Sequence, residues 1–331
     1  MRYLVTGGAG FIGSHLVDAL ASRGDEVLIL DDLSTGSRQN VQHLIDSGGV
    51  ELIEGSVLDG ALVDDCVRSV DRCFHLASAV GVQLVIDHPL DTLLANVNGT
   101  QNVMTAAARH DRWLLYTSTS EVYGKQERTP LTEDSDCVLG PPAVSRWSYA
   151  IAKAFGEALG HTLHSEGNAP VVMTRLFNVI GPRQTDRYGM VLPTFVRQAI
   201  TGRDLTVFGN GTQMRCFLHV SDAVHALLLL AEVEGCAGRV FNVGSTEEVA
   251  VIALAGRVID RTGSPSAIRL VPYAEAYGPG FEELGRRRPA TGELETATGW
   301  QPSRTLDEAI DQVAAYERSL AEQDQNLRLV G

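Results

Sequence analysis

A glycine-rich turn near the start of the chain constrains the fold more than any other feature. The sequence GGAGFIG follows a short apolar run, Tyr3–Thr6, and leads into a helical pattern over Phe11–Arg23. Gly7, Gly10 and Gly13 would allow, in turn, a tight turn, close approach of a pyrophosphate, and packing of helix on strand. The phosphates would lie at a helix N-terminus, where unpaired N–H groups and the helix dipole favour negative charge. The pattern predicts a strand–turn–helix unit that binds a dinucleotide.

The second predicted strand, Val27–Asp31, ends in a carboxylate. A carboxylate at this place accepts hydrogen bonds from both hydroxyls of a ribose and repels a 2′-phosphate, which favours NAD over NADP. The alternative is a glycine turn beside a solvated aspartate. The strand before the turn, the helix after it and Asp31 together favour the dinucleotide site.

Short β-branched runs alternate with helical stretches through the first half of the chain. This alternation is typical of an α/β protein with a Rossmann-type, doubly wound parallel sheet. After Asn178, proline and glycine become frequent, so we expect a smaller C-terminal α/β substrate lobe there. We place a NAD-binding domain at residues 1–176 and most of the substrate lobe at 177–331, with segments such as Arg239–Val243 returning to the main sheet. Further strands are expected at Glu51–Ile53, Cys73–Leu76, Trp113–Thr117 and Val171–Arg175, and helices at Asp91–Arg109 and Tyr149–Ser165.

The composition excludes several classes of protein. With 331 residues, 44% of them hydrophobic, the chain is long enough to bury a large core. Its formal net charge of −14 disfavours binding to nucleic acid, which needs a basic surface. No apolar stretch suits a signal peptide or a membrane span, so we expect a cytoplasmic protein. The five cysteines are odd in number and lack a CxxC spacing, which argues against disulfides and against a metal site.

A tyrosine and a lysine four residues apart, Tyr149 and Lys153, lie on one face of a predicted helix. A lysine ammonium stabilises a neighbouring phenolate, so we expect the pKa of Tyr149 to fall toward neutrality and the phenol to act as a base. Alone, the pair is equally compatible with two unrelated surface residues. The run TSTSEVYG follows the strand Trp113–Thr117, at the edge of the sheet where ligands bind in open α/β folds. Thr119 in this run can bridge a sugar hydroxyl and Tyr149.

Several sequences in a fixed order now carry a resemblance to a known family. VTGGAGFIGSHL, LDDLSTGS, TSTSEVYG, SYAIAK, RLFNVIGPRQ and FGNGTQMRCFLHVSD are similar to sequences of the extended short-chain dehydrogenase/reductases, and in particular of the nucleotide-sugar epimerases, dehydratases and decarboxylases. The similarity runs from residue 1 to about residue 301. It implies a Rossmann domain, tightly held NAD, and a UDP- or dTDP-sugar in the C-terminal lobe. It also implies a homodimer packed through helices that include the one carrying Tyr149.

The resemblance assigns roles position by position. The implied catalytic residues are Tyr149 as the base at the sugar 4-hydroxyl, Lys153, Thr119, Ser120 and Glu121. The implied cofactor-binding residues are Gly7, Gly10, Phe11, Ile12, Gly13, Asp31, Asp32, Ser34, Thr35, Gly36, Ser56, Val57, Leu76, Ala77, Ser78, Asn96, Thr117, Tyr149 and Lys153. The implied substrate-binding residues are Thr119, Ser120, Asn178, Val191, Leu192, Val207, Phe208, Arg215 and Arg287. Ser56 departs from the family, since many relatives have there an acidic residue that contacts adenine.

The resemblance leaves the reaction open, because all these enzymes first oxidise C4 of the sugar. A 4,6-dehydratase needs an acid for the leaving hydroxyl, and Ser120 is a poor acid where relatives of that type have aspartate. The pair Ser120-Glu121 resembles the decarboxylases, whereas SRWSYA and GPRQ with YGMVLP resemble UDP-sugar 4-epimerases that accept UDP-glucuronate. We expect 4-epimerisation of UDP-glucuronate to UDP-galacturonate, with UDP-glucuronate decarboxylation as the alternative. A non-catalytic NAD-binding regulator is disfavoured because Tyr149, Lys153 and Thr119 are all present.

Two further groups of residues have competing interpretations. Candidate partners for a uronate carboxylate are Ser120, Ser145, Arg183 and Arg187, among which spacing does not decide. In the HVSD sequence we expect Ser221 or Asp222 to cap a helix, and a hydrolase triad is disfavoured because its members meet in space rather than in one short run.

Overall fold

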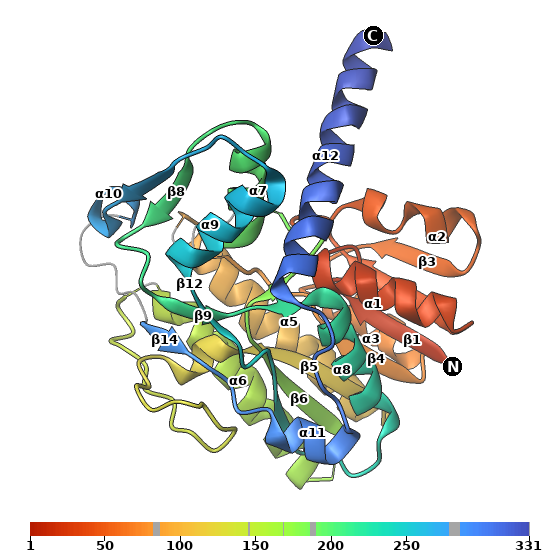
Figure 1. The fold of residues 1–331 in the computed structure, drawn as a ribbon. Coiled ribbons are helices and arrows are strands. Elements are labelled where there is room, and N and C mark those ends of the chain that lie inside the picture. The colour runs from red at the N-terminus through yellow and green to blue at the C-terminus, as the bar shows by residue number, and fades with distance from the viewer. Residues whose placement is uncertain (82–86, 145, 168, 186–189, 278–284, 331) are drawn as a thin grey trace.

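The computed structural model describes the chain except for residues 82–86, 145, 168, 186–189, 278–284 and 331, and only the backbone of 323–330 (Figure 1). A seven-stranded sheet in which all neighbours run parallel forms its centre. In spatial order the strands are β11 (Val240–Val243), β6 (Val171–Leu176), β5 (Trp113–Thr119), β4 (Arg72–His75), β1 (Arg2–Thr6), β2 (Glu26–Asp31) and β3 (Val50–Glu54). The order reverses after β1, as in a doubly wound Rossmann sheet.

Both faces of the sheet are covered, which explains why its strands are apolar without alternation. Tyr3 and Val5 of β1 pack in a core with helices α1 and α8, whereas Leu4 packs in a second core with α3 and α5. The helices around the sheet are α1 (Phe11–Ser22), α2 (Gln42–Asp46), α3 (Gly60–Arg68), α5 (Pro89–Arg109), α6 (Arg146–Ser165), α8 (Val220–Glu232) and α11 (Gly292–Thr298), with 3-10 turns η1 (Arg38–Asn40) and η2 (Ser120–Tyr123).

A smaller lobe with its own core follows Asn178. Helix α12 packs there against α7 and α9, and the far end of α12 extends away from the body (Figure 1). The elements of this lobe are β7 (Val179–Ile180), α7 (Val191–Ile200), β8 (Leu205–Phe208), β9 (Met214–Cys216), β10 (Leu218–His219), β12 (Glu248–Ala250), α9 (Val251–Thr262), β13 (Ile268–Val271), α10 (Tyr273–Tyr277), β14 (Arg286–Arg287) and α12 (Leu306–Val330). Strand β11, which lies between α8 and β12 in the chain, returns to the main sheet beside β6.

Two element boundaries near the predicted site differ from the sequence expectation. The helix expected to begin at Tyr149 begins one turn earlier, at Arg146, and the strand expected to end at Thr117 continues to Thr119. Thr119 therefore ends β5 and caps η2, where its side chain accepts a hydrogen bond from the Glu121 N–H. In the described part of the chain, no helix is long and apolar enough to cross a bilayer.

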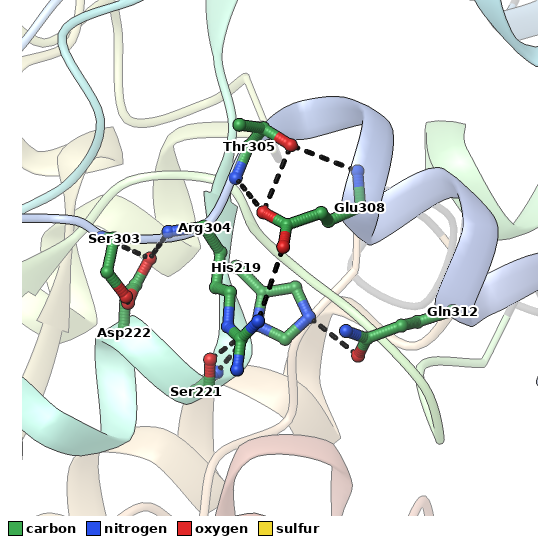
Figure 2. A network of polar contacts seen from close by, with 8 residues as sticks. All are labelled: His219, Ser221, Asp222, Ser303, Arg304, Thr305, Glu308 and Gln312. Atoms are coloured by element: carbon green, nitrogen blue, oxygen red, sulfur yellow. Dashed lines mark hydrogen bonds and ion pairs between the residues drawn. The ribbon is translucent and has the colours of Figure 1, made fainter.

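A polar network joins the start of α8 to the start of α12 (Figure 2). The Asp222 carboxylate is buried and accepts hydrogen bonds from the main-chain N–H groups of Ser303 and Arg304 and from the Ser303 hydroxyl. His219 contacts Ser221 on one side and Gln312 of α12 on the other. The expected cap, Ser221 or Asp222, is therefore wrong: His219 caps α8, and Asp222 instead holds the segment that leads into α12.

We expect Asp222→Ala to lower the free energy of unfolding by about 3 kcal/mol, because it leaves three donors of residues 303 and 304 without their buried acceptor. Urea unfolding followed by circular dichroism measures this change. The matched control is Asp307→Ala, which removes the same charge from a half-exposed site on α12 and should stay within about 0.5 kcal/mol. Equal stability of the two variants would contradict the role given to Asp222.

Candidate active site and dinucleotide cleft

The glycine turn lies at the carboxyl edge of the sheet, between β1 and α1. Gly7 has φ of +71°, and a side chain there would meet the Ala77 main chain at 2.7 Å. A side chain at Gly13 would lie 2.1 Å from the Gly7 carbonyl oxygen, so only glycine lets α1 start this close to the strand. Gly10 precedes α1 without a side-chain cap, which leaves first-turn N–H groups for a ligand. These features fit a pyrophosphate at the helix N-terminus.

A cavity of about 230 Å³ opens above this turn. It is lined by most of the residues expected to bind the cofactor, namely Gly7, Gly10, Phe11, Ile12, Gly13, Asp31, Asp32, Ser34, Thr35, Ser56, Val57, Leu76, Ala77, Ser78 and Thr117. Its lining also includes Leu30, Gly55, Leu58, Ala79, Val80, Ala95 and Leu176, which the sequence analysis did not name. Leu30, Gly55 and Leu176 belong to the carboxyl ends of strands β2, β3 and β6 or follow them, a position that could have identified them.

Four residues expected at the cofactor, Gly36, Asn96, Tyr149 and Lys153, are not among those that line the cavity, and the first two of them support it. Asn96 on α5 is buried, and its amide accepts hydrogen bonds from the Ala79 N–H and the Ser78 hydroxyl and donates one to the Ala79 carbonyl. It thereby fixes the loop that follows β4. Gly36 packs against Ala9 of the glycine turn, where a side chain would be 2.9 Å from the Ala9 carbonyl carbon.

Asp31 is buried at the end of β2 and holds the glycine turn. Its carboxylate accepts hydrogen bonds from the Ala9 and Leu33 N–H groups, both at 2.9 Å. Burial raises the pKa of Asp31, and these two hydrogen bonds partly offset the rise. Each oxygen retains a second lone pair, so the carboxylate can still accept from ribose hydroxyls. To donate this hydrogen bond, Leu33 adopts a φ of +58°, a left-handed conformation that is rare for leucine.

Tyr149 and Lys153 lie together beside the end of β5. The Tyr149 hydroxyl forms hydrogen bonds with the side chains of Ser78 and Thr119. The Lys153 Nζ donates to the Thr117 carbonyl at 2.8 Å and lies 5.9 Å from the centre of the Tyr149 ring. The structure thus brings together Tyr149, Lys153 and Thr119, as expected from the sequence.

The expected fall in the pKa of Tyr149 is not produced by the groups of the protein. Burial raises the pKa of Tyr149 well above its usual value, and the Glu121 charge adds to the rise, while hydrogen bonds from Ser78 and Thr119 act the other way. Helical spacing brings Lys153 close, but the same packing that brings it close also removes the phenol from water, and removal from water is the larger effect.

Glu121, in the turn η2 after β5, is clamped by arginines. Both of its oxygens accept hydrogen bonds from Arg287 of β14, and Arg146 of α6 lies 3.7 Å away. Burial raises the pKa of Glu121, but the charge and hydrogen bonds of Arg287, helped by Arg146 and Arg215, lower it more. Glu121 is therefore an ionised carboxylate at neutral pH. The adjacent Ser120 is buried. Arg146 was not named from the sequence, and its position three residues before Tyr149 was the available signal.

Arg287 was expected to bind the substrate, yet two of its nitrogens already bind Glu121. It is 4% exposed, and its Nε is buried without a hydrogen-bond partner in the described part of the chain. Arg287 pairs in register with Arg215 of β9, so the two guanidinium groups come from neighbouring strands. Asn178, with φ of +31°, donates its side-chain amide to the Cys216 carbonyl just before β10.

Some of the other expected substrate residues are placed differently from the expectation. Leu192 and Val207 are fully buried in the core of the second lobe, so only their main chains could reach a ligand, whereas Val191 and Phe208 remain partly exposed. Arg183 binds Asp18 on α1 at 2.7 Å, which removes it from the candidates for a substrate carboxylate. Ser145 and Arg187, also candidates, lie outside the described residues.

Comparison with known proteins identifies the family. The profile of the NAD dependent epimerase/dehydratase family matches residues 3–244. The chain belongs to this family. NAD is accordingly its cofactor, and the Rossmann-type fold expected from the sequence is confirmed.

Curated relatives of this family member cover nearly its whole length. It is 37% identical over 322 residues to a UDP-N-acetyl-alpha-D-glucosaminuronate decarboxylase of Bacillus cytotoxicus, covering 96% of this chain and 98% of that protein. It is 34% identical to UDP-glucuronic acid decarboxylase 1 of Danio rerio, covering 98% of this chain and 75% of that protein.

A solved structure gives a second kind of relative. The UDP-glucuronic acid 4-epimerase from Bacillus cereus, in complex with UDP-glucuronic acid and NAD, superposes with a TM-score of 0.86 at 25% identity, covering 97% of this chain and all of that one. Nucleotide sugars are therefore the ligands of its relatives, and decarboxylases are the closer match in sequence among the proteins compared.

We expect Asp31→Asn to weaken NAD binding about tenfold or more and to narrow the preference for NAD over NADP, because the variant loses the charged acceptor that disfavours a 2′-phosphate. Isothermal titration with each dinucleotide measures both effects. Glu26→Gln, at the exposed opposite end of β2, is the matched control and should bind both as the parent does. An unchanged NAD/NADP ratio in Asp31→Asn would contradict the assignment.

Proposed function

We propose that this protein decarboxylates a UDP-hexuronate, with UDP-glucuronate as the first substrate to test. The sequence analysis favoured 4-epimerisation, and the balance changes for two reasons. The curated relatives named above are decarboxylases over nearly the full chain. The observation that carries the proposal is the clamp of Arg287 on Glu121 near Tyr149, since an ionised carboxylate then already occupies the Arg287 guanidinium.

The first step in this proposal is removal of the proton from the 4-hydroxyl of the sugar. Tyr149 takes that proton, Thr119 keeps the hydroxyl and the phenol in one hydrogen-bonded line, and the Lys153 ammonium stabilises the phenolate. Bound NAD would take up the hydride from C4 and return it once carbon dioxide has left and C5 is protonated, and its positive charge favours the phenolate. The cofactor is held by the α1 N-terminus, Asp31 and the loop that Asn96 fixes.

The second step depends on the carboxylate of the substrate. A hexuronate oxidised at C4 is a β-keto acid, so its C5–C6 bond breaks, carbon dioxide leaves, and the electron pair moves into the C4 carbonyl. An arginine that stabilised the substrate carboxylate would oppose this loss. In this site Arg287 is already occupied by Glu121, so it has less stabilisation to give to a second carboxylate.

Glu121 and Ser120 also disfavour the 4,6-dehydratase reaction. Elimination of a hydroxyl needs a proton donor. Glu121 has a lowered pKa and is ionised at neutral pH, and Ser120 is a hydroxyl with an ordinary, very weak acidity. In the proposal Glu121 instead holds Arg287 and Arg146 and can orient a water or a hydroxyl that reprotonates C5.

The second candidate is 4-epimerisation of the same UDP-hexuronate, favoured by the superposition on a UDP-glucuronic acid 4-epimerase. Both reactions share the step at C4. An epimerase must keep the carboxylate out of line with the π system of the ketone while the ring turns over, whereas a decarboxylase must allow that alignment. The two candidates therefore differ in the product and not in the residues around NAD.

Incubation with NAD and UDP-glucuronate is expected to give a product lighter by one carbon dioxide, measured by mass spectrometry. UDP-N-acetylglucosaminuronate is tested in parallel, and UDP-glucose, which has no carboxylate to lose, is the negative control for mass change. Tyr149→Phe should reduce turnover about a thousandfold while leaving NAD binding intact, because only the proton acceptor is removed. Tyr316→Phe on α12 is the matched control and should turn over normally. A product of unchanged mass with inverted C4 would replace decarboxylation by epimerisation.

We also propose that two copies pair through α5 and α6. These helices pack side by side and carry exposed apolar side chains, Leu90 (64% exposed), Leu94 (43%) and Phe155 (37%). Such neighbouring apolar groups are costly to leave in water. Phe155→Lys should convert a dimer to a monomer in analytical ultracentrifugation, whereas Leu270→Lys, at an exposed leucine of β13, should not. A parent protein that sediments as a monomer would contradict this pairing.

A further inference from the structure

Lys153 is a charged group in an apolar place. It is 3% exposed, in the layer between α6 and β5. Its Nζ lies 4.9 Å from the centre of the Tyr116 ring and donates to the Thr117 carbonyl. A carbonyl oxygen and ring faces stabilise an ammonium only in part, and an ammonium without a counter-charge tends to lose its proton when buried.

A carboxylate lies one helical turn further along α6, at Glu157. It is 6% exposed and occupies the position four residues after Lys153, so the two side chains lie on the same helix face. Arg175 of β6 holds both Glu157 oxygens, with Nη2 at 2.7 Å and Nε at 3.0 Å from the nearer partners. The Ser118 hydroxyl donates to the same carboxylate.

Along β5, the residue that binds this carboxylate lies between the two residues that bind the reacting groups. Thr117 receives the Lys153 ammonium, Ser118 binds Glu157, and Thr119 binds Tyr149. Three consecutive residues of one strand thus fix the lysine, its neighbouring carboxylate and the phenol. Glu157 and Arg175 are both buried behind this strand, and the reacting group nearest to Glu157 along α6 is Lys153.

We propose that Glu157, held in place by Arg175, is a positioning residue that keeps Lys153 in its charged form, so that Tyr149 can release its proton at neutral pH. This inference rests on the proposed roles of Tyr149 and Lys153. It adds to them a buried ion pair one layer below the site.

The electrostatics around Lys153 agree with this role. Burial lowers the pKa of Lys153 to about 7, and the Glu157 charge acts in the opposite direction. The other titratable groups that face the ammonium are Tyr149 on the same helix, Tyr116 on β5 and His75 on β4, while Arg175 on β6 stands behind Glu157. His75 is neutral, since burial lowers its pKa to about 3, and burial raises the pKa values of both tyrosines. Glu157 is thus the negative charge among these groups.

The dependence of activity on pH is set by the charge of Lys153. The charged form of Lys153 is the active form, so activity persists below its pKa and is lost as the pH rises through it. Glu157→Gln removes the opposing charge and lowers that pKa. In the pH profile of kcat for the NAD-loaded enzyme, the alkaline limb should therefore move to lower pH by about one unit. Glu157→Asp, which keeps the charge at a greater distance, should restore part of the shift.

Two further variants separate charge from packing. Ser118→Ala removes one contact of the same carboxylate but keeps its charge, so its alkaline limb should stay where the parent has it. Glu157→Gln combined with Arg175→Gln leaves no unpaired buried guanidinium and should fold if the single variant does not, with its alkaline limb again moved to lower pH. A limb that stays in place, or failure of both Glu157→Gln variants to fold, would show that the pair is structural and overturn the proposal.

A second readout separates this proposal from the proposed function. Titration of the Tyr149 phenol in the NAD-loaded protein, by ultraviolet difference absorbance against Tyr149→Phe, requires no turnover. Glu157→Gln should titrate at higher pH than the parent because the neighbouring amine is neutral. An identical titration in both proteins would overturn the positioning role even if decarboxylation is confirmed. A shifted titration would support it even if the product assay fails.

Discussion

The burial of one ammonium, that of Lys153, sets the geometry of the whole reacting centre. An ion between a helix and a sheet persists only if every donor finds an acceptor and the elements around it do not move. Helix α6 can lie close enough to β5 because Gly156 faces Tyr116, where a side chain would come within 2.4 Å of the ring. That close approach lets Lys153 reach the Thr117 carbonyl, and the same helix then delivers Tyr149 to Thr119.

The acidic end of the site is assembled differently, from segments far apart in the chain. Glu121 and Arg287 are separated by 166 residues, and they meet because β14 pairs with β9 over the edge of the sheet where β5 ends. The second lobe is tied to the Rossmann body by β11 and by the Asp222 network. In the proposed reaction the first lobe thus supplies the base together with Lys153 and Arg146, the second lobe supplies Arg287 and Arg215, and the contact between the lobes aligns the two groups.

The sequence predicted those parts of the structure that depend on local pattern. Strand periodicity and the positions of Gly7, Gly13 and Asp31 gave the parallel sheet and most of the dinucleotide cavity, because each depends on neighbours in sequence and on a fixed strand–helix geometry. It could not predict that Arg183 binds Asp18 or that Arg287 clamps Glu121, since both depend on long-range register. It also gave the wrong direction for the pKa of Tyr149, because spacing reports proximity to Lys153 and carries no information about burial.

The same distinction explains why family motifs alone do not separate the two candidate reactions. Decarboxylation and epimerisation of a hexuronate share the residues at C4, so YxxxK and the threonine are equally compatible with both. The difference lies in how strongly the site stabilises the substrate carboxylate relative to the enolate formed when carbon dioxide leaves. An arginine free to form a bidentate pair with that carboxylate would protect it. Here the Arg287 guanidinium is taken by Glu121, whose lowered pKa shows how strongly the arginines favour its charge. The pairing in this cluster is set by tertiary contacts and not by any local motif, so the motifs alone do not decide between the two reactions.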